Sequence, residues 1–320
     1  MAVVITHFHW SKEQRLLLGF PFWIEMAVPI FMLISGYVYA ISYHRHAVDS
    51  FADAYNKNRI LKAFIRYTVP FLIIFFIECL FQIIIYIVRP DYQVPNVLYS
   101  LITGGWGPGS YYYPLLIQFI FLYPVLYFLI KKYNMVGLCI VILMNAGWEF
   151  LKVVLDVSPE LYRLLVFRYV LLISVGIYTY LCPNKLSKKA LYAFFMIGIS
   201  FIVYTAYFGN KVLFLEQWTG TCFVASMYVM PIFYIMVNKT FQINKSFDPI
   251  KKIGMASYNI FLFQMLYYKF LAGAVYNYIH YTLLQFVVCI FFPLIVGNLF
   301  FTKEDIFTKN IIKKILLRRN

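Results

Sequence analysis

Nine long apolar segments constrain this chain more than any other feature of its sequence. A helix that crosses a bilayer needs about 20 apolar residues, because the hydrocarbon core is about 30 Å thick and each residue advances the helix by about 1.5 Å. The sequence therefore predicts an all-α, polytopic integral membrane helix bundle. The segments, to within a few residues at each end, are 20–42, 64–88, 111–130, 135–153, 163–181, 190–208, 217–237, 254–275 and 281–301.

The composition excludes a soluble, secreted or disordered protein. Hydrophobic residues make up 62% of the chain and charged residues only 13%, whereas soluble domains have about 45–50% apolar and about 25% charged residues. The five cysteines are scattered and include no C-x-x-C pair. They therefore indicate neither a disulfide framework nor a thiolate metal site, and we expect no bound metal.

The opening stretch, residues 1–8, is apolar but too short to cross a membrane. It has no basic flank and no small-residue cleavage site, so it does not resemble a signal peptide. It resembles the second half of a helix whose first half is absent. We therefore expect about ten spans, the first of them truncated.

Basic residues predict the orientation of the bundle, because short cytoplasmic loops collect Lys and Arg. If the chain alternates sides, one set of loops carries twenty basic residues and the opposite set carries seven. The sequence thus predicts a multi-pass cell-membrane protein with its basic loops and C-terminus in the cytoplasm. This distribution also explains the formal net charge of +15 without nucleic acid as a partner. The basic loops are 45–66, 131–132, 185–189, 239–252 and 303–319.

The chain divides into a membrane domain, residues 1–302, and a basic tail, residues 303–320. Apolar residues recur at helical spacing between the lysines of the tail, which predicts an amphipathic cytoplasmic helix on the inner membrane surface, in contact with lipids. These residues are Ile306, Phe307, Ile311, Ile312, Ile315 and Leu316.

Polar residues inside spans are costly and point to function by default. We expect interhelical hydrogen bonds at Gln118, Glu149 and Asn298. An interfacial imidazole such as His7 can titrate near neutrality and act as a general base, but it can equally be a satisfied structural residue. The full set is His7, His9, Glu25, Ser35, Glu78, Gln118, Glu149, Arg168, Gln264 and Asn298.

Three short motifs follow one another in the first seventy residues. Val3-Val4-Ile5-Thr6-His7 is followed by Val28-Pro29 through Ser35-Gly36-Tyr37, and a basic loop then gives Arg59, Lys62, Arg66 and Pro70. This order resembles the membrane acyltransferase family 3, in which the motifs read V-V-x-x-H, V-P-x-F-F-x-x-S-G-Y/F and K/R-R-x-x-R-x-x-x-P. The segment from Gly254 to Gln264 resembles a late motif of that family, and the family's usual helix count is ten.

The resemblance implies transfer of an acyl group, usually acetyl from acetyl-CoA, to a hydroxyl of a cell-surface glycan or its lipid-linked precursor. It implies no permanently bound cofactor, and it makes residues 1–302 the acyltransferase domain. His7 would be the general base. Arg59, Lys62 and Arg66 would dock the polyanionic acyl-CoA, although they serve equally well as a positive-inside anchor.

Three further elements of the sequence bear on this site. Glu25 lies on the same side as His7 and could orient its imidazole. Ser35-Gly36 predicts a close helix crossing rather than a serine nucleophile, because no G-x-S-x-G turn is present. The glycine-rich segment 104–114 carries tyrosines that favour an interfacial aromatic belt over a glycan platform.

Two departures from the family pattern stand out. The family has an arginine eleven residues before its first-helix histidine, a position upstream of Met1 here. Gln264 stands where many relatives have histidine, and Gln cannot titrate.

The competing functions are a polytopic transporter or flippase and a multispan glycan polymerase. A transporter should show internal repeats, which the sequence lacks. A polymerase usually has a large external loop, whereas the outer segments here are short. Neither class explains the ordered histidine, Ser-Gly and basic-loop motifs.

Overall fold

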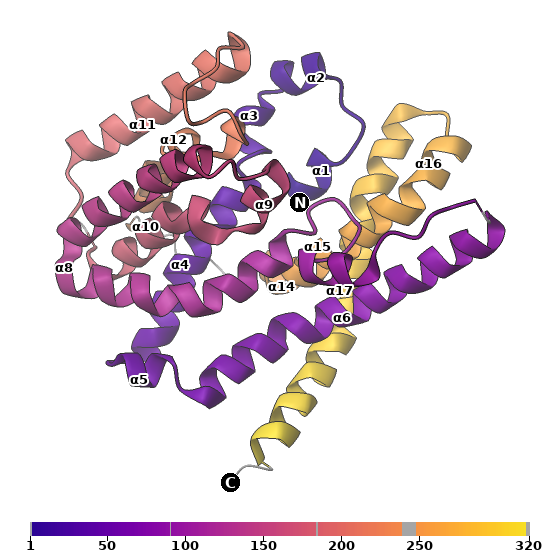
Figure 1. Cartoon of the computed structure of the whole chain (residues 1–320), viewed down its shortest axis with the longest axis horizontal. Coiled ribbons are helices and arrows are strands. Elements are labelled where there is room, and N and C mark those ends of the chain that lie inside the picture. The colour runs from indigo at the N-terminus through magenta and orange to yellow at the C-terminus, as the bar shows by residue number, and fades with distance from the viewer. Residues whose placement is uncertain (1, 90, 184, 239–247, 318–320) are drawn as a thin grey trace.

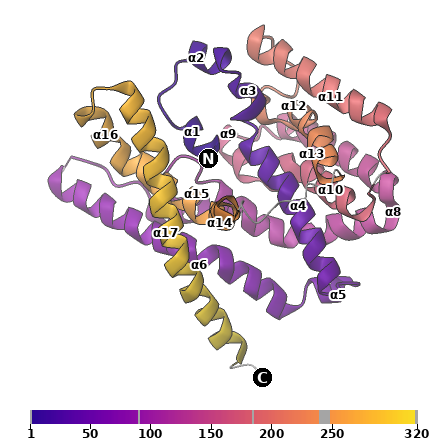
Figure 2. The same cartoon turned by 180° about the vertical axis from the view of Figure 1, so that it is seen from behind.

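The protein is a bundle of helices in a computed structural model that describes residues 2–89, 91–183, 185–238 and 248–317 (Figures 1 and 2). Within these ranges the elements are helices joined by turns, without a β-strand, which confirms the all-α prediction. The predictions that concern Met1, Lys239, Lys245, Arg318 and Arg319 lie outside the described residues.

The first third of the chain crosses the bundle and returns. Ser11 and Ser50 start short helices with capping boxes, each closed by the side chain three residues later. The long helix between them, α4, runs from the end of the molecule that holds α1–α3 to the end that holds α5 (Figure 1). The elements are α1 (Ala2–Thr6), α2 (Lys12–Leu17), α3 (Phe20–Trp23), α4 (Ala27–Arg45), α5 (Phe51–Ala54) and α6 (Lys57–Val88).

The middle third contains a tight helical hairpin. α8 is helical except at Asn134, where φ is 48° and ψ is −117°, and the chain reverses there at the edge of the bundle (Figure 1). The Asn134 carboxamide oxygen accepts a hydrogen bond from the Cys182 thiol at 2.9 Å. The break lies between two predicted spans. The elements are α7 (Val97–Thr103), α8 (Tyr112–Val154), α9 (Pro159–Leu164), η1 (Val166–Tyr169) and α10 (Val170–Leu181).

The last third ends in a long helix, α17, which continues unbroken past residue 302. Glu304 and Thr308 are buried there, and the Asn259 amide donates to the Glu304 carboxylate at 2.8 Å. No helix end marks the predicted boundary between residues 302 and 303, so a separate tail stays a prediction. The elements are α11 (Lys188–Ile202), η2 (Val203–Tyr207), η3 (Thr219–Thr221), α12 (Phe223–Ser226), α13 (Val229–Asn238), α14 (Asp248–Met255), α15 (Ser257–Leu266), η5 (Tyr267–Leu271), α16 (Ala272–Tyr278) and α17 (Thr282–Leu317).

Five helical segments in the described residues are long and apolar enough to cross a membrane. A sixth results if the pair Thr219–Ser226 and Val229–Asn238, bent by 51°, forms one span. The protein is therefore a membrane protein with several spans, and the count of ten stays a prediction. The five segments are Phe20–Arg45, Phe51–Val88, Tyr112–Val154, Lys188–Tyr207 and Thr282–Ile315.

Helix α10 forms the centre of the core, where it packs against α4 and α8. Two glycines allow α4 and α10 to meet backbone to backbone. A Cβ atom on Gly36 would lie 2.1 Å from the Ile173 carbonyl oxygen, and one on Gly176 would lie 2.1 Å from the Leu33 carbonyl oxygen. The close crossing predicted for Ser35-Gly36 is thus confirmed.

Candidate functional site

His7 lies in the turn that follows α1, outside the five candidate spans, and is half-buried. Helix α1 packs against α4, α15 and α17. The His7 ring centroid is 5.7 Å from that of Tyr268, and the Tyr268 hydroxyl donates to the Val4 carbonyl oxygen at 2.9 Å. The end of α1, and with it the imidazole, is therefore held by a π-helical turn from the far end of the sequence.

The surroundings of His7, burial first and a nearby charge second, keep its imidazole neutral. Burial and the neighbouring Arg15 guanidinium lower the pKa of His7 to about 4. A neutral imidazole has a free lone pair, so His7 is in the protonation state that a general base requires at pH 7.

Glu25 is paired with Arg15 rather than with His7. The Arg15 Nη2 donates to Glu25 Oε1 at 2.8 Å, and a Cβ atom on Gly220 would lie 2.9 Å from Glu25 Oε2. Among the described residues, no hydrogen bond joins His7 to Glu25. Sequence reasoning missed Arg15 as part of this group, because Arg15 lies in α2 and Glu25 lies just after α3, and a contact between two short helices joined by a bend follows no helix or strand spacing.

A small cavity lies beside α1, with a volume of about 40 Å³. Gln264 is fully buried at its wall, and within the described ranges neither its amide nitrogen nor its amide oxygen has a hydrogen-bond partner. Buried polar atoms are normally paired, so an unpaired amide at a cavity fits a polar ligand. The lining residues are Val3, Val4, Phe31, Ile253, Ser257, Ile260, Phe261 and Gln264.

The glycine-rich segment 104–114 packs against the same helix, α15. A Cβ atom on Gly107 would lie 2.4 Å from the Met265 carbonyl oxygen, and the Trp106 backbone N–H donates to a Glu78 carboxylate oxygen at 3.2 Å. Tyr112 is buried in the core, which is neither the interfacial belt nor the glycan platform that the sequence suggested.

Arg59, Lys62 and Arg66 lie within the first ten residues of α6. Lys62 and Arg66 are exposed, whereas Arg59 is half-buried with its guanidinium carbon 5.5 Å from the Tyr43 ring centroid. Among the described side chains, no carboxylate lies within 4.0 Å of any of the three. Among the described residues they thus form a basic group without a direct ion pair.

Helix α1, which His7 follows, and the start of α6, which carries the basic group, lie toward opposite ends of α4 (Figures 1 and 2). Nineteen residues of α4 correspond to about 28 Å at about 1.5 Å per residue. The structure therefore brings together the three members of the basic group, and separately His7 with Arg15 and Glu25, but does not join the two groups.

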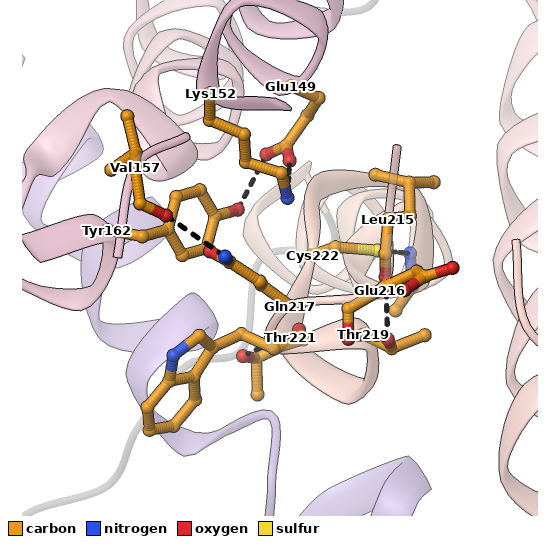
Figure 3. A network of polar contacts seen from close by, with 12 residues as sticks. Glu149, Lys152, Val157, Tyr162, Leu215, Glu216, Gln217, Thr219, Thr221 and Cys222 are labelled. Carbon is orange, nitrogen blue, oxygen red and sulfur yellow. Dashed lines mark hydrogen bonds and ion pairs between the residues drawn. The ribbon is translucent and has the colours of Figure 1, made fainter. Parts of the chain in front are cut away.

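Glu149 and Gln118 make the interhelical contacts that were predicted for them. The Tyr162 hydroxyl donates to Glu149 Oε1 at 2.7 Å, and Lys152 Nζ lies 2.5 Å from Glu149 Oε2 (Figure 3). The Gln118 side chain donates to the Leu164 carbonyl oxygen at 2.6 Å and accepts from a backbone N–H of η1. In the part of the chain that is described, no cluster of His, Cys, Asp or Glu could hold a metal ion.

One comparison with known proteins gives a match. A family model described as an acyltransferase domain matches residues 1–302, a range that contains His7, Glu25, the basic group and Gln264. No curated protein and no solved structure matches the chain.

Proposed function

The chain belongs to the acyltransferase domain family, and on that premise we propose that it transfers acetyl from acetyl-CoA to a hydroxyl of a bacterial surface polysaccharide or its lipid-linked precursor. One observation carries the proposal: a neutral imidazole ends the short helix whose Val3 and Val4 line a cavity with an unpaired amide. A base near a small, mostly apolar cavity with one unpaired amide suits attack of a hydroxyl on a thioester.

The chemistry assigns His7 as a general base and then as a general acid. Its imidazole takes the proton of the acceptor hydroxyl while that oxygen bonds to the thioester carbonyl carbon. The carbon–sulfur bond then breaks, and the CoA thiolate leaves with the proton from the imidazolium. In this proposal the Gln264 amide N–H donates to the thioester carbonyl oxygen as its negative charge develops.

Glu25 acts in this proposal as a positioning residue through Arg15. Its carboxylate neutralises the guanidinium beside His7. Without Glu25, an uncompensated cation would disfavour the imidazolium that forms during transfer. Glu25 therefore supports the base without touching it.

Donor binding is assigned to Arg59, Lys62 and Arg66, because acetyl-CoA is polyanionic. Helix α15 connects this basic group to the cavity: its Tyr258 hydroxyl donates to the Tyr67 carbonyl oxygen, next to Arg66, at 2.9 Å, and its Gln264 lines the cavity. The acyl arm of the donor would follow α15 from one group to the other.

The test of the reaction is to incubate membranes that contain the protein with radiolabelled acetyl-CoA and candidate glycans. We expect alkali-labile label on the glycan. Label that stays on CoA with every acceptor would remove the acetyl-to-glycan assignment, and glycan movement without label would favour a transporter.

Replacing all three cations by Gln (R59Q, K62Q and R66Q) is expected to raise the KM for acetyl-CoA at least tenfold, with little change in kcat. Charge-assisted contacts to phosphate are lost, while the reacting groups stay in place. Steady-state kinetics in membranes would measure both constants.

A matched control for this triple variant removes three exposed lysines that are also predicted to lie on the cytoplasmic side of the membrane (K185Q, K188Q and K189Q). Equal KM values in the two triple variants would show that Arg59, Lys62 and Arg66 are only a topology anchor.

The pH dependence of the rate tests the state of His7. Because a base must be unprotonated and the pKa of His7 is held at about 4, kcat/KM should stay level from pH 8 to about 5 and fall below that. A fall centred near pH 6.5, about the ordinary imidazole pKa, would show that the surroundings do not depress it.

A further inference from the structure

Arg168 is a buried cation that makes no ion pair with any described residue. Its side chain is 1% exposed, and its Nη2 donates to the Tyr169 hydroxyl and, at 3.3 Å, to the Thr221 hydroxyl. Its Nε and Nη1 have no hydrogen-bond partner among the residues that the structure describes. In the described part of the chain, no carboxylate lies within 4.0 Å of the guanidinium. Buried arginines are normally paired, so these N–H groups call for an oxyanion.

Four aromatic rings surround this guanidinium. Its central carbon lies 4.5 Å from the ring centroid of Tyr169, 5.1 Å from Trp218, 5.7 Å from Tyr162 and 5.9 Å from Tyr111. Cation–π contact favours the charge but leaves the N–H groups unpaired. These four rings, which we call the ring cage, therefore hold the Arg168 side chain in place but do not provide hydrogen-bond acceptors for its Nε and Nη1 groups.

Trp218 forms the outer wall of the ring cage. It is 39% exposed, and its backbone has a φ of 52°, in the left-handed region that a bulky residue rarely adopts. Its ring centroid is 6.0 Å from that of Tyr111. Neighbouring Gln217 is tied to the Val157 carbonyl oxygen at 3.0 Å (Figure 3). Exposed aromatic faces of this kind stack on sugar rings.

The short helix η3 connects the ring cage to the group around His7. Thr221 accepts from Arg168, and the adjacent Gly220 lies against the Glu25 carboxylate that is paired with Arg15. Thr219 holds the start of this turn through a hydrogen bond to the Leu215 carbonyl oxygen at 2.6 Å (Figure 3). Arg168 and His7 therefore lie on the same side of the bundle.

We propose that Arg168 and its ring cage bind an oxyanion of the acceptor, a phosphate or carboxylate group attached to the sugar that receives the acyl group. Trp218 and Tyr111 contact the sugar, and Arg168 pairs with the anion. This inference rests on the proposed function and adds to it that the acceptor is anionic.

The test is a binding experiment on the purified protein without acetyl-CoA. The probes share one disaccharide: a neutral form, a form with a uronic-acid carboxylate and a form with a diphosphate at its reducing end. We expect at least one anionic form to bind at least ten times more tightly than the neutral form. Arg168→Gln should abolish that preference, whereas the control Arg89→Gln, which removes an exposed arginine, should keep it.

Two further variants test the site if Arg168→Gln does not fold. Arg168→Lys retains a charge and should keep a reduced preference, while Trp218→Ala should weaken all three probes by a similar factor. Equal binding of the three probes to the unmodified protein, or an unchanged preference in Arg168→Lys and Arg168→Gln, would overturn the proposal.

The two anionic probes, the carboxylate form and the diphosphate form, identify the source of the anion. A preference for diphosphate indicates a lipid-linked acceptor, and one for carboxylate indicates an acidic polysaccharide. An anion preference without any acetyl transfer would leave this site standing and remove the proposed reaction.

Discussion

A His7→Ala enzyme is expected to lose about 10²- to 10⁴-fold in kcat, with the KM for acetyl-CoA changed by no more than about twofold. The imidazole is the group near the cavity that can take the proton of the acceptor hydroxyl at neutral pH, and donor binding is assigned to residues at the other end of α4. Rates with saturating and limiting acetyl-CoA would separate the two constants.

His9→Ala is the matched control for this experiment. His9 lies two residues further on, in the loop after the turn, is exposed, and has its ring centroid 4.2 Å from that of Tyr276. We expect its kcat to stay within about threefold of the starting value, since a contact of this type carries stability rather than chemistry. Full activity in His7→Ala would leave the acyltransferase class standing and overturn the assignment of the base.

Gly36→Ala is expected to destabilise the protein by about 1–3 kcal/mol or more. The new methyl group would overlap the Ile173 carbonyl oxygen, 2.1 Å away, and the backbone of α10 cannot yield without disturbing its packing against α8. Thermal unfolding in detergent, followed by loss of the monodisperse species, would measure the change.

Gly147→Ala provides the control, because it makes the same substitution in a helix with open space around the new methyl group. It should be neutral or stabilising by up to about 1 kcal/mol, the difference in helix propensity. Gly176→Ala should destabilise the protein about as much as Gly36→Ala. The double variant should lose less stability than the sum of the two single losses, because both substitutions separate the same pair of helices. Equal melting temperatures for Gly36→Ala and Gly147→Ala would contradict the crossing.

Local sequence patterns predicted the helices well, because the length of an apolar segment and the position of its small residues can be read from that segment alone. The break at Asn134 lies between two predicted spans, and Gly36 makes the predicted crossing. The number of spans was less predictable. α12 and α13 are separated by a bend, and α10 is short, so apolar composition alone does not determine which segments cross.

The candidate site was predictable only in its separate residues. His7, Glu25 and the basic group were predicted from motifs, but the Arg15–Glu25 ion pair depends on how a loop closes. The ring cage of Arg168 collects side chains from three distant stretches of the chain, which no spacing rule covers. A lone arginine in an apolar segment was the signal available, since such residues are rarely without function.

The contact between α4 and α10 also constrains how the protein is made. The ribosome completes α4 well before it begins α10, and the helices from α5 to α9 are synthesised in between. During that interval the Gly36 face of α4 lacks its main partner, α10. Helix α8, which is made earlier, contacts this face through the Tyr123 hydroxyl, which donates to the Gly36 carbonyl oxygen at 3.3 Å. The insertion machinery, or early neighbours such as α6, must retain α4 in the bilayer until Leu181 has emerged. Assembly of the core is therefore a late event in biogenesis.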